Sequence, residues 1–314
     1  MSTRPVIAPL ALAACLAAFA AAPALAAGED AAAEDSTAAE QPAPPPAPPA
    51  APPFAFAKPV FDETWATLGL GAGLVPSYAG SNDYIAFPLP LIAGRVGGVG
   101  ISPNGPGFSL DLFSPRPTLA PRTKPRLAAG PVLRFRNDRA NRITDTVVAR
   151  AGKLDAALEL GGNVAVIFPG VFRKFDQLTL GAQARRDVLG AHGGWVVEPQ
   201  VGYRALLGKA FTLQAQVSAE FVDESFADYY FTVTPAQATA TGLPQFRADG
   251  GLNRIGTTAT LAYDLDRNPL NGGWSLTGVA GAGRMIGDSA RTPYTRLRGD
   301  PNQFILGAGV AFTF

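Results

Sequence analysis

The stretch that decides the fold is "QFILGAGVAFTF", residues 303–314, in which large apolar residues fall at every second position. One register holds Phe304, Leu306, Ala308, Val310 and Phe312, and the other is small or polar from Gly307 to Thr313. Successive side chains of a β-strand point to opposite faces, so this period of two predicts a strand whose two faces differ chemically. A soluble sheet and a membrane barrel could both contain such a strand, and the rest of the chain has to distinguish them.

The same alternation recurs along the chain, for example over 66–74, 195–204 and 211–221. These segments run about ten residues, the length that crosses a bilayer at a tilt, whereas strands of soluble sheets usually have five or six. Aromatic residues stand near the segment ends, as interfacial girdles do: Trp65, Trp195, Tyr203, Phe211, Phe221, Trp274, Phe304 and Phe314. A sheet in hydrocarbon must close because a free edge leaves backbone groups unpaired. The sequence therefore predicts an all-β fold, a closed antiparallel transmembrane β-barrel; the alternative is a soluble sandwich with its apolar face inward.

The strand count follows from the spacing of these segments. We expect twelve strands, near 65–74, 84–95, 97–102, 108–113, 126–136, 155–168, 175–186, 195–205, 210–221, 253–265, 273–284 and 303–314. Long connections (137–154, 222–252, 285–302) alternate with short ones (169–174, 206–209, 266–272), as in outer-membrane barrels whose N- and C-termini are both periplasmic. The segment 114–125 is an exception, because it is long although it falls on the periplasmic side, where the connections should be short. The third and fourth strands are also short, so ten strands are the alternative.

The chain begins like a secreted protein. Arg4 precedes an apolar, alanine-rich run, and Ala24-Leu25-Ala26 forms a small-x-small cleavage site, so residues 1–26 are predicted to be a signal peptide. The alternative is a transmembrane anchor, which needs about twenty apolar residues. Cys15 follows Leu-Ala-Ala as in a lipoprotein acylation site, but the residues after it stay apolar, which favours a cysteine inside a removed signal.

The segment after the signal predicts no folded structure. Residues 27–60 are rich in alanine and proline, and we expect a disordered periplasmic linker in front of a barrel at 61–314. A mature chain without Cys15 has no cysteine, which excludes disulfides and thiolate metal sites.

Charge excludes several classes of function. The 26 Lys and Arg residues balance 25 Asp and Glu, and removal of Arg4 with the signal leaves 25 of each. A chain without net positive charge has no global field for nucleic acid, and none of the usual zinc or nucleotide-binding motifs occurs. We therefore expect no nucleic-acid partner, cofactor or metal.

Charged residues of the inward register are the candidate site: Arg134, Arg136, Glu159, Arg185, Glu198, Arg204 and Glu220. Rings of charge select ions in channels. Arginine and glutamate can equally satisfy one another across neighbouring strands. Twelve strands lie between the filled eight-stranded barrel and the open sixteen-stranded porin. We favour structural pairing, with a selectivity filter as the alternative.

The single histidine, His192, raises the question of an enzyme. An acyl hydrolase needs a histidine near a serine and a carboxylate, and Ser218 with Glu220 is a conceivable set. His192 lies in a predicted outer turn, however, whereas Ser218 and Glu220 belong to another strand. We interpret it as a loop histidine and predict no catalytic residues and no enzyme.

One longer stretch is more specific than the alternation. "LGLGAGLVPSYAGSNDYIAFPLPLI", 68–92, contains Tyr78-x-Gly80-Ser81-x-x-Tyr84 followed by Pro88-Leu89-Pro90, and it resembles the start of the MipA/OmpV family of outer-membrane proteins. The resemblance continues through 156–162, 227–246 and 284–295. It implies an outer-membrane barrel that serves as a scaffold between a lytic transglycosylase and a murein synthase; other members are described as porin-like or adhesive. The turn at 78–84 is rich in Gly, Ser, Asn and Asp, which favours a tight turn over a binding loop.

The expected partners are therefore outer-membrane lipids, a murein hydrolase or synthase, and the barrel-assembly machinery during biogenesis. If the scaffold interpretation holds, a periplasmic enzyme would dock on residues 27–60 or on 114–125. The alternative function is a porin-like channel for small solutes.

The terminal aromatic gives a prediction about assembly. Phe314 ends the apolar register, and we expect Phe314→Ser to slow insertion, because an aromatic last residue resembles the signal by which outer-membrane barrels are recognised. Heat-modifiable gel migration measures the folded fraction, and His192→Ala is the control expected to insert normally. Insertion of the Phe314 variant as fast as the parent would show that "GVAFTF" is not an insertion signal.

Overall fold

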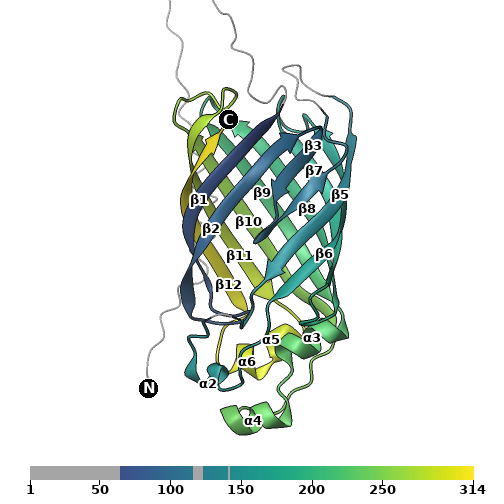
Figure 1. Cartoon of the computed structure of the whole chain (residues 1–314), viewed down its shortest axis with the longest axis vertical. Helices are drawn as coiled ribbons and strands as arrows, with labels where there is room; N and C mark the ends of the chain where they lie inside the picture. The colour runs from purple at the N-terminus through teal and green to yellow at the C-terminus, as the bar shows by residue number, and fades with distance from the viewer. Residues whose placement is uncertain (1–63, 116–122, 141) are drawn as a thin grey trace, which may run out of the picture. The chain divides into compact units, whose positions relative to one another are not determined.

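The barrel is closed and antiparallel. The computed structural model describes residues 64–115, 123–140 and 142–314. Each strand pairs with its chain neighbours, and β1 pairs with β12 to close the ring (Figure 1). The strands are β1 Trp65–Pro76, β2 Tyr84–Val96, β3 Val99–Pro103, β4 Gly107–Asp111, β5 Arg126–Arg136, β6 Ala157–Pro169, β7 Gln177–Asp187, β8 Trp195–Leu207, β9 Phe211–Val222, β10 Gly251–Asp264, β11 Gly273–Met285 and β12 Asn302–Thr313.

The prediction of twelve strands is confirmed, including the short third and fourth strands. The predicted signal peptide with Cys15, the linker, and residues 116–122 of the anomalous loop lie outside the described residues. Those boundaries stay predictions.

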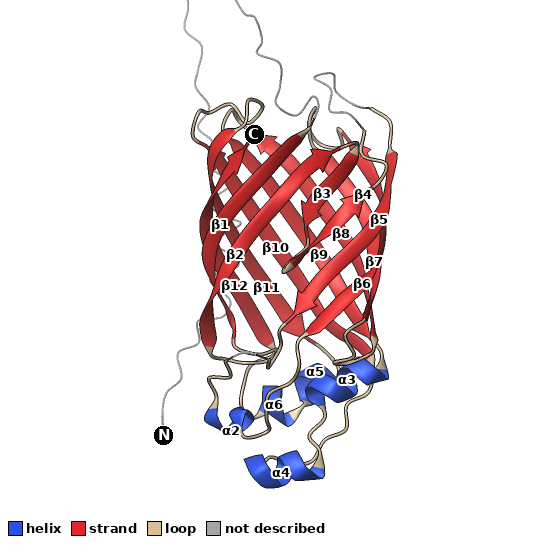
Figure 2. Cartoon of the chain, viewed as in Figure 1, coloured by secondary structure: helices blue, strands red, loops and turns tan. Residues whose placement is uncertain are grey.

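Helices gather at one end of the barrel, away from the C-terminus (Figure 2). They are α2 Thr146–Ala149, α3 Glu224–Phe231, α4 Pro235–Thr241, α5 Asp288–Arg291 and α6 Pro293–Arg296. All five lie in the long connections that follow β5, β9 and β11, so the long connections share one end, as predicted. We call these helices and their flanking loops the cap. None of the helices in the described part of the chain is long and apolar enough to cross a membrane.

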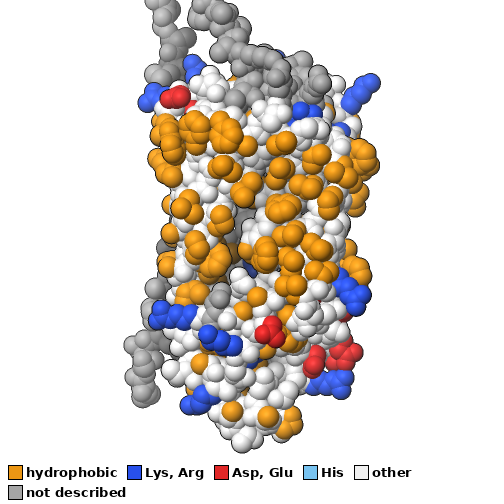
Figure 3. Space-filling view, viewed as in Figure 1, with side chains coloured by type: hydrophobic (Ala, Val, Ile, Leu, Met, Phe, Trp, Pro, Cys, Tyr) orange, Lys and Arg blue, Asp and Glu red, His pale blue; other side chains and the backbone are white. Residues whose placement is uncertain are grey.

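The outer surface of the barrel is apolar. Outward-facing leucine, isoleucine and valine side chains are about half exposed on nearly every long strand (Leu68, Leu70, Ile92, Leu127, Val164, Leu180, Val201, Val217, Leu276, Leu306 and Val310). Figure 3 shows apolar side chains spread over the strands, with charged side chains gathered toward the two ends. A monomeric soluble protein does not expose so large an apolar surface, whereas a barrel in a bilayer requires it.

Aromatic residues mark both rims of this surface. At the C-terminal end, Trp274 packs on Phe312 with ring centroids 5.1 Å apart, and Phe211 packs on Tyr263 at 4.9 Å. At the cap end Trp195 and Phe221 are exposed on the outside. Their positions match the expected interfacial girdles.

The seam between β1 and β12 is built from small residues. Gly71 lies opposite Gly309, and Gly73 opposite Gly307. A methyl group on Gly71 or Gly309 would overlap the backbone of the facing strand. These inward positions carry no side chain, which lets Leu89 of β2 lie directly over Gly73 and Gly307.

Candidate functional site

Six inward-facing charges meet inside the barrel near the cap, and we call them the lumen network: Arg134, Arg136, Glu159, Arg185, Glu198 and Glu220. Arg136 donates from Nε to Glu159 Oε1 (2.6 Å) and from Nη2 to Glu220 Oε2 (2.9 Å). Arg185 donates from Nε to Glu159 Oε2 (2.9 Å) and from Nη2 to Glu198 Oε2 (3.0 Å). Arg134 donates from Nη1 to Glu198 Oε2 (3.1 Å). Three cations face three anions, so the network is neutral.

Strand register brings these residues together. Arg134 and Arg136 are at the end of β5, Glu159 at the start of β6 and Arg185 at the end of β7, and antiparallel pairing places these ends at one level. The side chains of Arg185 and Glu159 are fully buried. Buried charges persist only when paired, and each of these charges has at least one oppositely charged partner, although Arg185 Nη1 has no hydrogen-bond acceptor among the described residues.

Amides extend the network on two sides. Gln183 Nε2 donates to Glu198 Oε2 (3.2 Å), and Asn104 Nδ2 donates to Gln183 Oε1 (2.8 Å). Asn253 Nδ2 donates to Glu220 Oε1 (2.7 Å). The network therefore links strands β5 to β10 with the tip of the β3–β4 hairpin. The predicted structural pairing is present, and Asn104 and Asn253 are members that charge patterning had not identified.

Arg204 is separate from the network, contrary to the grouping predicted from the sequence. It faces Gln177 and Gln214 on the neighbouring strands, near the C-terminal end of the lumen. Its side chain is exposed, and it forms no ion pair within the described ranges. The alternation shows that Arg204 and the network residues all face the lumen, but it does not show at which level of the barrel each one lies. Arg204 lies at a different level, which explains the difference.

His192 lies in the β7–β8 turn, as predicted for a loop histidine, but it is buried rather than solvated. Its Nε2 is 3.5 Å from Glu159 Oε1, and its ring packs on Phe226 with centroids 4.9 Å apart. Its Nδ1 accepts a hydrogen bond from the Gly194 amide (3.1 Å). His192→Ala would therefore disturb packing, and it is not the neutral control that the sequence suggested.

The conceivable Ser218–His192–Glu220 set is not assembled. Glu220 is held by Arg136 and Asn253, and His192 by Glu159. Ser218 lies opposite Gln200 and Gly256, and no hydrogen bond between the described residues joins it to His192. Within the same residues, no cluster of three or more His, Cys, Asp or Glu could hold a metal ion.

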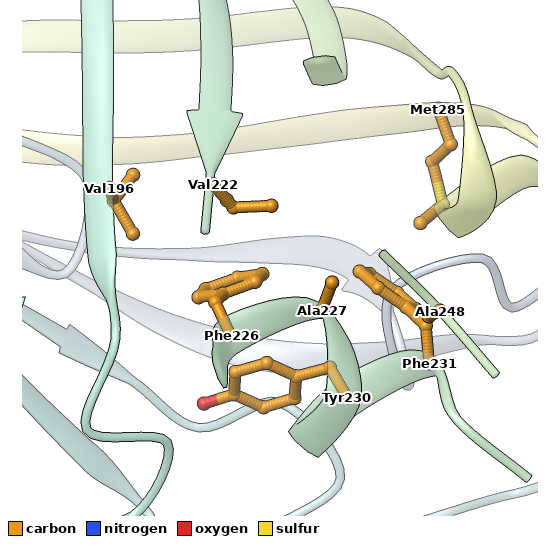
Figure 4. Packing of buried hydrophobic residues seen from close by; sticks show 8 residues of the cluster. All are labelled: Val196, Val222, Phe226, Ala227, Tyr230, Phe231, Ala248 and Met285. Atoms are coloured by element: carbon orange, nitrogen blue, oxygen red, sulfur yellow. The ribbon is translucent and has the colours of Figure 1, made fainter. Parts of the chain in front are cut away.

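Helix α3 packs into the barrel mouth. Val196, Val222 and Met285 belong to the wall, and Phe226 and Tyr230 of α3 pack against them in one buried cluster (Figure 4). The Arg136 guanidinium lies 4.7 Å from the Phe226 ring centroid, a cation–π contact that joins the cap to the lumen network. The cap and the charges below it therefore form one unit that covers this end of the lumen.

A second buried cluster ties the loops of the cap together: Tyr78, Val148, Val233, Leu243 and Tyr294. Gly80, in the turn after β1, has φ +92°, and a methyl group there would overlap Thr295. Gln303 accepts from the Gly80 amide (3.2 Å) and donates to the Ser81 carbonyl (3.0 Å). The Tyr-x-Gly-Ser segment is thus a tight turn docked on the start of β12 and the loop before it.

Asp145 fastens two of these loops. It caps α2 by accepting from the Val147 and Val148 amides (both 2.8 Å), and Arg298 Nη2 donates to it at 2.7 Å. Burial alone would raise the pKa of Asp145, but the hydrogen bonds from Arg298 and the two amides outweigh it and lower that pKa below its usual value.

This contact predicts acid sensitivity of the cap. A carboxyl group whose pKa is lower in the folded than in the unfolded protein stabilises the fold at pH values above its unfolded-state pKa, which is about 3.9 for Asp. This stabilisation is lost as the pH falls through the folded-state pKa. We expect Asp145→Asn to be less stable than the parent at neutral pH and the two thermal unfolding curves to converge in acid. A difference that stays constant with pH would contradict the assignment. Arg247→Gln, which removes an ion pair with Glu224 whose two side chains are both exposed, is the matched control.

Comparison with known proteins places this geometry in a family. The model of the family described as "MltA-interacting protein MipA" matches residues 68–314. The putative outer membrane protein YiaT of Escherichia coli, in strains K12 and O157:H7, is 31% identical over 70 residues, which are 22% of this chain and 28% of the relative. The match thus spans under a third of the curated relatives' length.

Two solved structures are similar in part. The COG4313 outer membrane channel from Pseudomonas putida F1 has 14% identity and a TM-score of 0.39 over 80% of this chain and 96% of that chain. A Pseudomonas aeruginosa FadL homologue has 11% identity and a TM-score of 0.24 over 80% and 89%. Scores this low say nothing about function.

The family match covers most of the chain and nearly all of the described barrel. The motif at 78–90, with which the resemblance began, lies inside the matched range; its first part forms the docked turn described above, and its second part, from Tyr84, belongs to β2. The chain therefore belongs to the MipA family of outer-membrane β-barrel proteins.

Proposed function

We propose that this protein is a non-enzymatic scaffold of the outer membrane that binds a murein hydrolase or synthase on its periplasmic side. The observation that carries the proposal is the neutral, mutually paired lumen network beneath a packed cap. Charges that pair with one another support a structural role for the network and leave no unpaired ring of charge to select ions. The family description, MltA-interacting protein, supports an enzyme of murein turnover as the partner.

The cap end is the extracellular end in this proposal. Outer-membrane barrels have short turns on the periplasmic side and long loops outside. The turns at the end away from the cap are short where described, such as Gly97–Gly98 between β2 and β3. Both termini of the barrel would then face the periplasm, where murein enzymes work. Residues 27–60 and 114–125 are the segments proposed to bind the partner, because the remaining turns at that end offer little surface.

Affinity recovery of the transglycosylase MltA from detergent extract tests the proposal. Deletion of residues 27–60, or replacement of 114–125 by a short Gly-Ser linker, is expected to reduce recovery. The matched control replaces α4 by a Gly-Ser linker at the other end and should keep it. Unchanged recovery after both periplasmic changes, in barrels that keep heat-modifiable migration, would overturn the scaffold proposal.

A channel for small solutes is the second candidate, because polar side chains line part of the lumen below the network. Arg204 and Gln214 face inward there, and both are exposed. Planar-bilayer recording separates the two functions. Stable single-channel steps whose ion selectivity changes in Arg134→Glu would favour the channel, whereas a silent, folded barrel would favour the scaffold.

A further inference from the structure

The barrel wall has a window on one side of the cap-end half. Strands β3 and β4 have five residues each, whereas β2 has thirteen. β3 pairs with β2 at Gly94–Val96, and no other described residue pairs with the rest of this edge of β2, from Tyr84 to Ala93. Figure 2 shows the β3–β4 hairpin ending partway along the barrel between β2 and β5.

The frame of the window is held in place by polar contacts. At its cap end, the Ala79 amide after β1 donates to Asp138 Oδ1 (2.9 Å) in the loop after β5. On the hairpin side, Asn104 at the tip reaches into the lumen to Gln183, and the Phe135 amide of β5 donates to the Pro106 carbonyl (2.9 Å). The tip thus turns away from β2 and stays with β5.

The free edge of β2 has fewer hydrogen-bond donors than an ordinary strand edge. Val96 and Val99 flank a two-residue turn and pair across it, so the backbone N–H and C=O groups of Val96 point toward β3. Every second residue of β2, counted back from Val96, points these groups to the same side, which beyond Gly94 is the free edge. Pro88 and Pro90 fall in this register, so two positions of the free edge have no N–H group to satisfy. A proline inside a sheet is confined to such an edge, and an unpaired backbone donor in hydrocarbon is strongly unfavourable.

The window opens at the level of the hydrocarbon. Ile92 beside it is 51% exposed on the outer face, and Phe108 and Phe135 are exposed on the hairpin side. Figure 3 shows this face hollowed between two apolar areas. What meets the opening from outside is therefore the chain region of the bilayer.

The lumen behind the window is apolar, unlike the lumen at the network. The inward residues of β2 are Ile85, Phe87, Leu89 and Leu91, all partly exposed. The inward positions of the neighbouring strands β1 and β12 are glycines. Leu89 lies so close to Gly73 and Gly307 that a methyl group on either glycine would overlap its side chain. One side of the lumen thus suits a hydrocarbon chain, and the opposite side suits polar groups.

From this geometry we infer a lipid site: the window between β2 and the β3–β4 hairpin admits one hydrocarbon chain of a bilayer amphiphile onto Phe87, Leu89 and Leu91. The chain would pass the donor-poor edge of β2 at Pro88 and Pro90 and lie on the inner apolar wall. This site requires neither of the functions proposed above, since it lies in the wall and not at either end.

Fluorescence quenching by labelled lipid tests the site in the full chain. In a Cys15→Ala background, Phe87→Cys is labelled with bimane and the protein is placed in vesicles containing phosphatidylcholine with doxyl groups on the chain. We expect quenching about as strong as for Ile92→Cys, which faces lipid. Thr258→Cys, on the inward face of β10, should be much less quenched by lipid. Leu91→Cys replaces Phe87→Cys if the latter does not fold by heat-modifiable migration.

The outcomes are distinct. Lipid quenching at Phe87→Cys that falls when Leu89→Asp is added, with Ile92→Cys unchanged, supports the site. Quenching by doxyl-stearate but not by the phospholipid supports it for single-chain amphiphiles. Quenching at Phe87→Cys by aqueous iodide alone, or by no quencher, would show that chains do not enter and would overturn the inference.

Discussion

Glu159→Gln is expected to destabilise the barrel by about 3–5 kcal/mol, because it removes one partner from a buried charge cluster. Glu159 is fully buried and accepts from both Arg136 and Arg185. The amide cannot balance two guanidinium groups, so the cluster would hold three cations and two anions away from bulk water. Urea unfolding of the protein refolded into vesicles measures the loss.

Two further variants test whether charge is the cause. Arg204→Gln removes an inward but exposed arginine without an ion pair in the described residues, and its effect should stay within about 0.5 kcal/mol. Adding Arg185→Gln to Glu159→Gln restores neutrality and should cost less than the sum of the single changes. Parent-like stability of Glu159→Gln would show that the network does not stabilise the fold.

Phe226→Ala is expected to release the cap while leaving the strands paired. Its ring is 1% exposed and contacts Tyr230, His192 and the Arg136 guanidinium. Removal of a buried phenyl group costs about 3–5 kcal/mol, and here the loss falls on the contact between α3 and the mouth. We expect faster proteolysis within 223–250 and higher conductance in planar bilayers.

The matched control for this prediction is Leu297→Ala, which changes an exposed leucine on the same end of the barrel. It should alter neither proteolysis nor conductance. If Phe226→Ala keeps the cap protease-resistant and the barrel silent, helix α3 is not what closes the mouth.

The strands could be predicted because their pattern is local. Alternation at 66–74 and 303–313 assigns each side chain to a face, and the structure places Leu68 and Leu306 on the outside and Gly71 and Gly309 inside. The bilayer outside and the lumen inside make the two faces of each strand chemically distinct, so the two-residue alternation is visible in the sequence itself.

The cap could not be predicted in the same way. Its helices have four to eight residues, too short to be stable alone, and they form because buried contacts such as Phe226 on Val222 hold them. Local signals were most complete for α4, where Thr234 and Gln237 form a capping box and Gly242 ends the helix at φ +74°. The N-cap aspartates of α2 and α3, Asp145 and Asp223, are weaker signals because they are not followed by a capping-box partner. The burial of His192 depends on α3, so it was equally hidden.

The sequence predicted that the residues of the lumen network face inward, but not which of them pair with one another. Register places Glu159 directly opposite Arg134 and Asp187, yet its ion pairs are diagonal, to Arg136 and Arg185. Long side chains reach diagonal neighbours as easily as direct ones, so pairing depends on side-chain conformation.

The seam between β1 and β12 has a consequence for the order of folding. In the part of the chain that the structure describes, every other strand pairing joins neighbours in sequence, whereas the Thr67 and Thr313 hydroxyls meet at 2.7 Å across 246 residues. Hairpins form from nearby residues and therefore quickly, while a contact this distant waits until the intervening strands are in place. Joining of the first and last strands should then be the slow, committing step of assembly. A chain labelled at Thr67 and Thr313 would report that step as the last change in energy transfer.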